Sequence, residues 1–451
     1  MMNISQLKRL GLFDARVPRY TSYPPATAFG LFADDSFQQE CLGALDPGQP
    51  VSVYVHIPFC ERLCWFCACQ TQGVSTLNPV TAYMASLEAE LDQLRALIPA
   101  GIRMGRLHWG GGTPTILPPA LMRRLTLAVQ HVFEPTPDCE FSIEIDPTLV
   151  DEPKIATMAE LGLTRASLGI QDFSANVQEA IGRMQSYEQT RDCVELLRRY
   201  GVTSLNADLV YGLPHQTPER FLATVDQVLE LQPDRVALFG YAHVPHHSKR
   251  QKLILETALP SGEQRHALAG LAADRFVGAG FEAIGIDHFS RPQDALAQAA
   301  RTGRLRRNFQ GYTDDTCPAL IGVGASAISN FPQGIVQNAV MTPAYSERVS
   351  CDVLAGARGH RHTAQDRLRA RAIEMIMCDF RLDMAELHRD FGSRATCLDA
   401  SIALVRAQFG AGLRHRGQGL EILPEARALT RLVAALFDER VVEGARYSQA
   451  S

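Results

Sequence analysis

Short β-like runs alternate with helical stretches between about residues 50 and 240, and this alternation limits the fold more than any other feature of the chain. Residues 81–97 carry apolar side chains at helical spacing, Ser186 opens a second helix as a capping box, and Thr217-Pro218 opens a third. Strands separated by helices pair in parallel, which predicts an α/β fold. Six units predict a partial (β/α)6 barrel. The expected strands are 51–57, 106–109, 140–145, 165–170, 203–210 and 235–241.

Polar or cysteine-rich segments stand at the end of every expected strand. In parallel barrels the loops at the carboxyl ends of the strands build the active site, so these segments are expected to share one rim. In strand order they are the loop after residue 57, Gly110-Gly-Gly-Thr-Pro-Thr115, Glu144 with Asp146, Gln171, Asp208, and Tyr241-Ala-His-Val-Pro245.

The loop after residue 57 holds four cysteines within ten residues, and Cys60, Cys64 and Cys67 have the spacing C-x3-C-x2-C. Such a loop presents three thiolates to three corners of a four-iron four-sulfur cluster and leaves one iron open to a small chelating molecule. A structural zinc site is the alternative, but zinc usually gathers two well-separated ligand pairs. The spacing therefore favours the cluster, and it resembles that of the radical S-adenosylmethionine (SAM) enzymes.

The other rim residues each admit a plain structural role as well. Glycines 110–112 fit a tight turn, or bare backbone that binds the amino group and carboxylate of SAM. Glu144 fits a solvated strand end or an acceptor for a ligand ammonium group. Asp208 lies among apolar residues, where a charge needs a partner, and we expect a ligand or an arginine there. Tyr54 and His56 share one strand face, for packing or for chemistry.

Composition excludes several classes of protein. The 451 residues are 46% hydrophobic and 21% charged, with a net charge of -5. A mildly acidic chain is a poor general nucleic-acid binder. No run of 18 apolar residues predicts a membrane span, and the first residues lack the apolar core of an export signal, so we expect a cytoplasmic protein.

The chain as a whole resembles the oxygen-independent coproporphyrinogen III oxidases, from about residue 15 to 450. The Arg-Tyr-Thr-Ser-Tyr-Pro segment and the fourth cysteine, Cys69, distinguish this family from related haem chaperones, which are expected to lack both. The motifs that carry the resemblance are Arg19-Tyr-Thr-Ser-Tyr-Pro24, Tyr54-Val-His-Ile-Pro-Phe-Cys60, Cys64-Trp-Phe-Cys-Ala-Cys69, His108-Trp-Gly-Gly-Gly-Thr-Pro-Thr115, Ser142-Ile-Glu-Ile-Asp-Pro147, Asp208-Leu-Val-Tyr-Gly-Leu-Pro214, Phe309-Gln-Gly-Tyr312 and Gly322-Val-Gly-Ala-Ser-Ala-Ile-Ser329.

The resemblance implies the cofactors and their residues. One 4Fe-4S cluster would be bound by Cys60, Cys64 and Cys67, whereas Cys69 would not be a ligand. The SAM molecule on the open iron would contact Tyr54, Gly111, Glu144 and Ile328. A second SAM would contact Phe66, Gly112, Thr113, Gln171, Arg183, Asp208 and Ala242. The candidates for a catalytic role are Cys69, His56 and Tyr54.

The implied reaction is the oxidative decarboxylation of two propionates of coproporphyrinogen III to vinyls, giving protoporphyrinogen IX. It needs an electron donor for the cluster and a final electron acceptor, and we expect a monomer. An anionic tetrapyrrole also needs cationic contacts, for which Arg19, Arg183 and Arg358-Gly-His-Arg-His362 are candidates. A haem-delivery protein and another tetrapyrrole-directed radical SAM enzyme are the alternatives.

Some positions depart from the family pattern. Trp65 stands where a tyrosine is expected, Gln70 where an asparagine-like residue is expected, Asp314 where a second threonine is usual, and His362 where an aliphatic residue is typical. These departures put the fine-tuning of the substrate site in doubt.

Three regions are expected along the chain: an N-terminal extension over 1–45 that packs on the barrel, the barrel over 46–330, and a helical region over 331–451. The last shows helical runs at 364–378, 384–391 and 397–408, a hairpin around 412–423 and a helix over 424–437. This order is winged-helix-like, but no basic recognition helix stands out, and a lid over the barrel mouth is the preferred interpretation.

Overall fold

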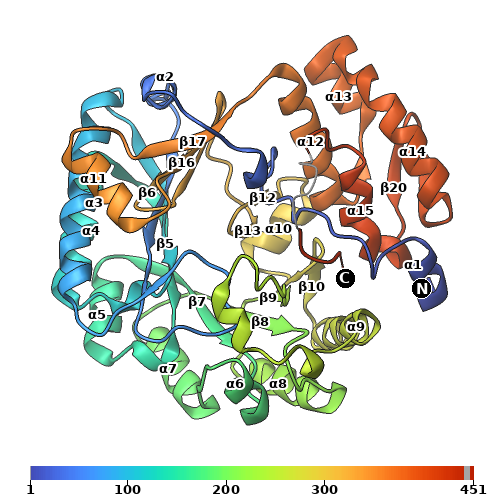
Figure 1. The fold of residues 1–451 in the computed structure, drawn as a ribbon, viewed down its shortest axis with the longest axis horizontal. Helices are drawn as coiled ribbons and strands as arrows, with labels where there is room; N and C mark the ends of the chain where they lie inside the picture. The colour runs from blue at the N-terminus through green and yellow to red at the C-terminus, as the bar shows by residue number, and fades with distance from the viewer. Residues whose placement is uncertain (1, 441–446, 451) are drawn as a thin grey trace.

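The computed structural model describes residues 2–440 and 447–450 of the chain. One large mixed sheet dominates it, with helices along its outer face (Figure 1). In spatial order its strands are β1 (Gly30–Leu31), β17 (Gly356–Arg361), β16 (Gly334–Asn338), β15 (Ile328–Phe331), β14 (Leu320–Val323), β2 (Val51–Ile57), β5 (Arg103–Gly111), β6 (Glu134–Ile145), β7 (Leu163–Gln171), β8 (Ser204–Tyr211), β9 (Arg235–Gly240), β11 (His288–Ser290) and β10 (Glu282–Ile284).

The six expected strands are confirmed as β2, β5, β6, β7, β8 and β9, each paired in parallel with the next. A seventh parallel strand, β14, pairs with the free side of β2, and the sequence analysis did not include it. Beyond β14 the sheet continues in antiparallel strands as far as Arg361, so it crosses the boundary that we expected at residue 330. The strand order ends at β1 and β10, which leaves the barrel partial.

Alternation along the parallel strands separates an apolar outer face from a polar inner face. Val53, Val55 and Ile57 of β2 are buried in the main core, together with Leu107 and Trp109 of β5. Helices cover this face because each presents an apolar stripe to it. They are α3 (Asn78–Leu97), α4 (Pro119–Val132), α5 (Glu152–Glu160), α7 (Tyr187–Arg199), α8 (Pro218–Glu230) and α9 (Gly262–Gly278).

The expected helix starts are confirmed in atomic detail. The Ser186 side chain accepts from the Gln189 N–H and the Gln189 side chain accepts from the Ser186 N–H, which is the capping box. Thr217 caps α8 with Pro218 at its first position. Gly201, just after α7, has φ +87°, a conformation that closes a helix at little cost for glycine.

The C-terminal region forms a second core. Its elements are α12 (Ala364–Asp379), β18 (Arg381–Leu382), α13 (Met384–Phe391), α14 (Asp399–Phe409), β19 (Leu413–Arg416), β20 (Gly419–Ile422) and α15 (Thr430–Ala435). The hairpin gains a third strand, β18. Two expected helix starts were wrong: residues 392–398 and 424–429 form 3-10 turns before α14 and α15 begin.

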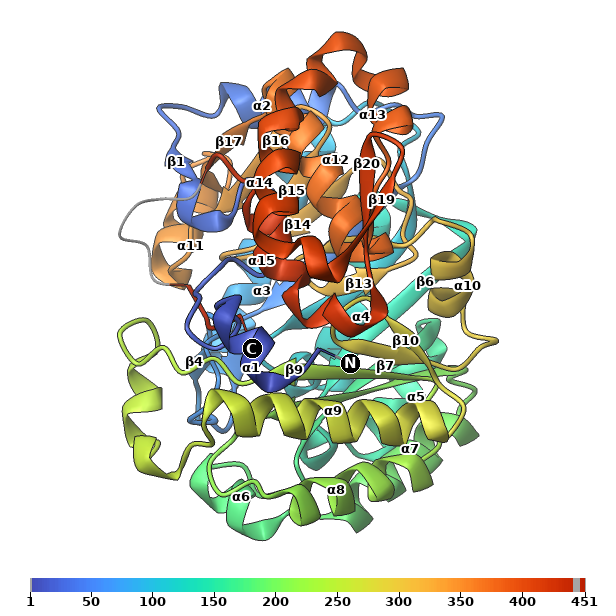
Figure 2. The same cartoon turned by 90° about the vertical axis from the view of Figure 1, so that its right-hand side faces the viewer.

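The N-terminal residues belong to both cores. Leu7 and Phe13 pack into the C-terminal core, whereas Phe37 and Leu42 pack into the core of the sheet. Figure 2 shows α1 (Ile4–Arg9) beside α15, and a backbone bridge joins Arg16 to Gln449. In the described residues, no helix is both long and apolar enough to span a membrane.

Candidate active site

The polar inner face of the parallel strands lines a cavity of about 150 Å³. The register of the strands places Tyr54 beside His108, and His108 beside Ser142. These three polar side chains therefore lie at the same level along neighbouring strands. The functional candidates Glu144 and Asp208 also line this cavity, at the carboxyl end of the strands. Two of the predicted rim residues, Glu144 and Asp208, therefore line one cavity.

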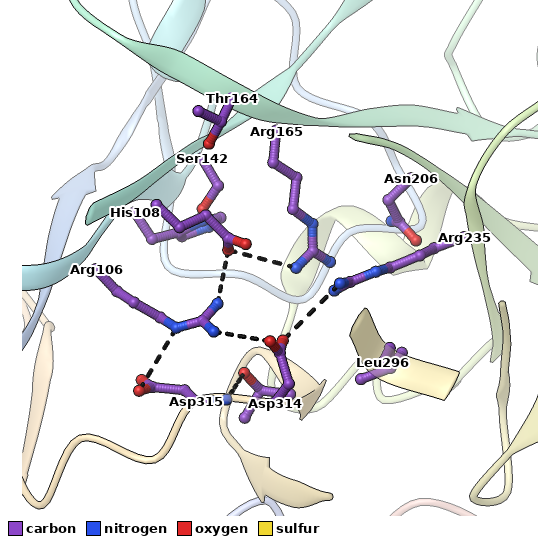
Figure 3. A network of polar contacts seen from close by, with 12 residues as sticks. Arg106, His108, Ser142, Thr164, Arg165, Asn206, Arg235, Leu296, Asp314 and Asp315 are labelled. Atoms are coloured by element: carbon purple, nitrogen blue, oxygen red, sulfur yellow. Dashed lines mark hydrogen bonds and ion pairs between the residues drawn. The ribbon is translucent and has the colours of Figure 1, made fainter. Parts of the chain in front are cut away.

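An ion network closes the opposite end of the cavity (Figure 3). Arg106 donates to Glu140 and to Asp314, both at 2.8 Å, and Asp314 lies 3.8 Å from Arg235. The departure at Asp314 is thus explained, because its carboxylate stands between two arginines that need a counter-charge. Arg165 lies 3.8 Å from Glu140 and completes the network.

Each of the three cysteines predicted to bind the cluster accepts a hydrogen bond from a different residue. The Thr113 hydroxyl donates to the Cys60 sulfur at 3.5 Å, and Arg183 Nη1 donates to the Cys64 sulfur at 3.6 Å. The Cys69 backbone N–H donates to the Cys67 sulfur at 3.4 Å. Donors aimed at sulfur stabilise thiolates, the form in which cysteine binds metal.

The same cysteines do not converge on one point. Among the residues that the structure describes, no three His, Cys, Asp or Glu side chains are gathered closely enough to hold a single metal ion. The thiolates of a four-iron cluster each bind a different iron, so they need no common point, whereas the ligands of one zinc ion do. That Cys60, Cys64 and Cys67 bind a cluster stays a prediction.

The loop at Gly110–Gly112, here called the glycine loop, packs directly on the loop that holds Cys60, Cys64, Cys67 and Cys69, here called the cysteine loop. A Cβ on Gly112 would lie 2.6 Å from the Phe59 carbonyl oxygen, and one on Gly111 would lie 2.6 Å from the His56 ring. Gly111 also has φ +115°, which side chains rarely adopt. Close packing therefore requires glycine at positions 111 and 112. The bare backbone of Gly111 also lies next to Glu144.

Glu144 is held as a carboxylate at the rim. The Gly111 N–H donates to it at 3.1 Å, and His108 Nε2 lies 3.6 Å away. Burial opposes the charge, but His108, Gly111 and His56 together lower the pKa of Glu144. Its side chain is 41% exposed to the cavity, so an ionised acceptor faces the space beside the cysteine loop.

Tyr54 and His56 form a pair on the inner face of β2, as expected. The Tyr54 oxygen and His56 Nδ1 are 2.9 Å apart, and His56 Nε2 is 3.4 Å from the Gln70 carbonyl oxygen. The departure at Gln70 therefore leaves this contact intact, since it uses the backbone. Burial lowers the pKa of His56 and raises that of Tyr54, so both are neutral around pH 7.

A second group lies further round the rim, centred on Arg183. This arginine donates to Asp146 at 3.0 Å and to the Gly169 carbonyl oxygen at 2.7 Å. Gln171 ends β7 in the left-handed region, with φ +68°, which turns its side chain from the regular strand direction. Trp65 packs against Gly182, the residue before Arg183, where a Cβ would lie 2.8 Å from the ring.

In the part of the chain that the structure describes, Asp208 does not have the arginine that was one of its two expected partners, and a ligand there stays a prediction. Ser167 donates to it at 2.8 Å and Asn206 at 2.7 Å, and no arginine is among its recorded hydrogen-bond partners within the described residues. Burial raises the pKa of Asp208 to about 6, against the effect of these two donors.

The sequence analysis missed a segment that clamps the cysteine loop. The Gln251 amide donates to the carbonyl oxygens of Phe66, at 2.7 Å, and Ala242, at 3.1 Å. Ser248 donates to the Cys67 carbonyl oxygen at 2.9 Å, and Arg250 to that of Cys69 at 3.2 Å. Only the run of polar side chains after Pro245 hinted at this role.

The remaining candidates lie on the far side of the cavity mouth. Ile328 lines a neighbouring cavity together with Phe309, whose ring lies 5.0 Å from that of Tyr54. His362 lines the same cavity, and burial lowers its pKa. By contrast, Arg358 and Arg361 are taken up by Gln337 and Glu40.

Comparisons with known proteins identify the family of the chain. A model of the radical SAM superfamily matches residues 54–228. The chain is 58% identical to the oxygen-independent coproporphyrinogen III oxidase of Cereibacter sphaeroides (strain ATCC 17025) over the whole of both chains. It is 50% identical to the protein of that name from Paracoccus denitrificans, over 96% of each.

A solved structure extends the similarity to the fold. The coproporphyrinogen III oxidase of Escherichia coli, described as a radical SAM enzyme, is 35% identical and superposes with a TM-score of 0.90. The match covers 95% of this chain and 100% of that one. Relatives of this identity across nearly the full length, together with the cysteine loop and rim described above, place the chain in the oxygen-independent coproporphyrinogen III oxidase family of radical SAM enzymes.

Proposed function

We propose that this chain oxidatively decarboxylates two propionates of coproporphyrinogen III to vinyls, giving protoporphyrinogen IX in haem biosynthesis. The observation that carries the proposal is the cysteine loop, in which the sulfurs of Cys60, Cys64 and Cys67 accept hydrogen bonds beside an ionised Glu144. The names of the relatives supply the substrate.

Cys60, Cys64 and Cys67 would hold a 4Fe-4S cluster with one iron left for SAM. The bound cluster and SAM supply a carbon radical that removes a β-hydrogen from the propionate, which no side-chain base could do at a useful rate. The part of the protein is to position the reactants and to exclude water from the cavity.

The SAM molecule at the cluster would be held by Tyr54, Gly111, Glu144 and Ile328. Glu144 suits the ammonium group of SAM, because its lowered pKa keeps it charged and its side chain faces the cavity. Bare backbone at Gly111 allows the ligand to approach closely.

A second SAM would lie against Phe66, Gly112, Thr113, Gln171, Arg183, Asp208 and Ala242. Two features support this finer proposal. Gln251 draws Phe66 and Ala242 together from separate loops, and Asp208 offers a buried acceptor that suits a ribose hydroxyl or an ammonium group.

Cys69, His56 and Tyr54 are proposed to act on the substrate. Loss of carbon dioxide from the substrate leaves one electron to be passed on, so an external donor and a final acceptor are both required. Cys69 is exposed at the end of the cysteine loop and Tyr54 faces the cavity, and both are therefore available to the reacting group.

We propose further that the region over 331–451 acts as a lid on a monomeric enzyme. Support comes from the cavity of about 350 Å³ that this region shares with the cavity mouth, between Tyr23, Phe309 and Ile373. Size-exclusion chromatography with light scattering tests the monomer.

Anaerobic incubation with coproporphyrinogen III, SAM and a reductant tests the function. We expect protoporphyrinogen IX, methionine and 5′-deoxyadenosine. A haem-delivery protein would bind haem and leave the substrate unchanged, and a methyltransferase would release S-adenosylhomocysteine; either outcome would contradict the proposal.

A further inference from the structure

A cavity of about 260 Å³ beside the active site is lined by many more cations than anions. It lies between the ends of β8 and β9, the N-terminal segment and the C-terminal region. Asp287 is the one acidic residue on its described wall, against Arg19, Arg265, Arg307, Arg427 and Arg431. Such an excess of guanidinium groups favours an anionic ligand.

Three of these arginines are occupied by the protein itself. Arg431 donates to the carbonyl oxygens of Val17 and Gln449, at 2.6 and 2.8 Å, and so ties the two ends of the chain together. Arg265 donates to the Tyr241 carbonyl oxygen at 2.6 Å, and Arg427 lies over the Phe380 ring at 4.2 Å.

Arg307 is different, because it is a buried cation that stacks on the Tyr312 ring, 4.4 Å from its centre, and leaves most of its hydrogen-bond donors unused. Its side chain is 4% exposed, yet Nε and Nη1 have no hydrogen bond in the described structure. Nη1 is 3.7 Å from the Asp287 carboxylate, which is too long for a hydrogen bond, and Asp287 is shared with His288 at 2.7 Å. A buried donor without a partner is costly, which indicates a missing acceptor.

Arg19 completes the pair. One of its nitrogens donates to the Gly240 carbonyl oxygen at 2.9 Å, and Arg307 donates to the Arg19 carbonyl oxygen at 3.5 Å. The side chain of Arg19 is open to the cavity, but enough protein surrounds it that burial lowers its pKa, against the charge of Asp287. The Asp287 carboxylate thus forms an ion pair with Arg307 and acts on Arg19 through its charge, and the two guanidinium groups have capacity for another acceptor.

This cavity adjoins the reaction centre. Phe239 lines both it and the central cavity, and Arg307 lines both it and the cavity that contains Phe309 and Ile328. A ligand group held by Arg19 and Arg307 therefore belongs to a molecule that reaches the site of the chemistry.

We propose that Arg19 and Arg307 bind a propionate carboxylate of the substrate that the reaction leaves intact. This rests on the proposed function, in which two of the four propionates react and two do not. The cavity is large enough for such side arms but not for the macrocycle, so holding them here would direct the other rings to the radical. Of the three cationic candidates named from the sequence, Arg19 is the one on this wall.

Equilibrium binding under anaerobic conditions tests this with two probes, coproporphyrinogen III and its tetramethyl ester. We expect Arg19→Gln and Arg307→Gln to weaken binding of the tetra-acid about ten- to hundredfold, as loss of a charged hydrogen bond does, and to leave ester binding and iron content unchanged. Arg389→Gln removes an exposed charge far along the chain and is the matched control.

Unchanged binding of the tetra-acid in both variants would overturn the proposal. So would an equal loss for acid and ester, because the arginines would then only shape the cavity. If Arg307→Gln fails to fold, Arg307→Lys replaces it, because lysine keeps the charge. Arg19→Gln changes an exposed side chain and tests the proposal independently. Failure of the proposed function is seen separately, as absence of the vinyl product with wild type.

Discussion

Arg183 and Asp146 form a buried ion pair, with Nη1 of the arginine 3.0 Å from Oδ2 of the aspartate and each side chain 9% exposed. The same guanidinium group lies 3.6 Å from the Cys64 sulfur. Arg183 therefore links the cysteine loop to the far side of the rim, and its loss has two separable consequences.

Arg183→Ala is expected to weaken binding of one SAM by roughly 1.5–3 kcal/mol, because a charged hydrogen bond to the ligand carboxylate is lost. It should also lower stability by about 3–5 kcal/mol, since among the described residues Asp146 keeps one cationic partner, Arg62 at 3.5 Å. Counting bound SAM by titration measures the first effect. Arg183→Lys, which keeps the charge, is the control, and a wild type that binds one SAM would refute the second site.

Anaerobically purified protein is expected to contain about four irons per chain. Cys60→Ala, Cys64→Ala and Cys67→Ala should each abolish the bound iron, because each removes one thiolate of the cluster. Cys193→Ala, which alters a buried cysteine in α7, is the matched control and should keep full iron. Stoichiometric zinc without iron after reconstitution would contradict the cluster.

Cys69→Ser is expected to keep the iron and to lose vinyl formation. Cys69 contributes its backbone N–H to the Cys67 sulfur, and serine keeps that bond. Iron analysis and product analysis on the same sample separate the two effects. Loss of iron would make Cys69 a fourth ligand, which would close the open position that SAM needs.

The sequence predicted those parts of the fold that depend on local pattern. The capping box at Ser186 and the six parallel strands follow from residues near one another in the chain. β14 could not be predicted in the same way, because its parallel partner is β2, far away in sequence, and its other partner is the short antiparallel strand β15. The rim was predicted because parallel strands bring their carboxyl ends together whatever the loops do.

The pattern of the sequence could not predict contacts that loops make. Gln251 clamps Phe66 only after residues 245–251 have folded over the cysteine loop. Asp208 shows the same limit: its charge needed a partner, but only the register of β7 and β8 identifies Ser167 and Asn206 as the donors.

Glu90 of α3 offers a prediction of pH dependence away from the cluster. It is 1% exposed, and it accepts hydrogen bonds from the Gly324 N–H, the Asn338 amide and the Tyr345 hydroxyl, each at 2.7 Å. It thereby anchors the turn after β14 to α3. Burial raises its pKa from 4.5 to about 7, although the three donors oppose that shift.

Since the folded protein binds this proton more tightly than the unfolded chain, the stabilisation is fully present below about pH 4.5. It is lost as the pH rises through about 7, and amounts to about 3 kcal/mol in total. Glu90→Gln cannot titrate, so the stability of wild type relative to this variant is expected to fall between pH 5 and 8. Anaerobic urea unfolding midpoints of both proteins, compared across this range, measure the difference, with the exposed Asp92→Asn on the same helix as the control. A relative stability that stays constant or rises with pH would show that the three donors outweigh burial and hold Glu90 ionised throughout.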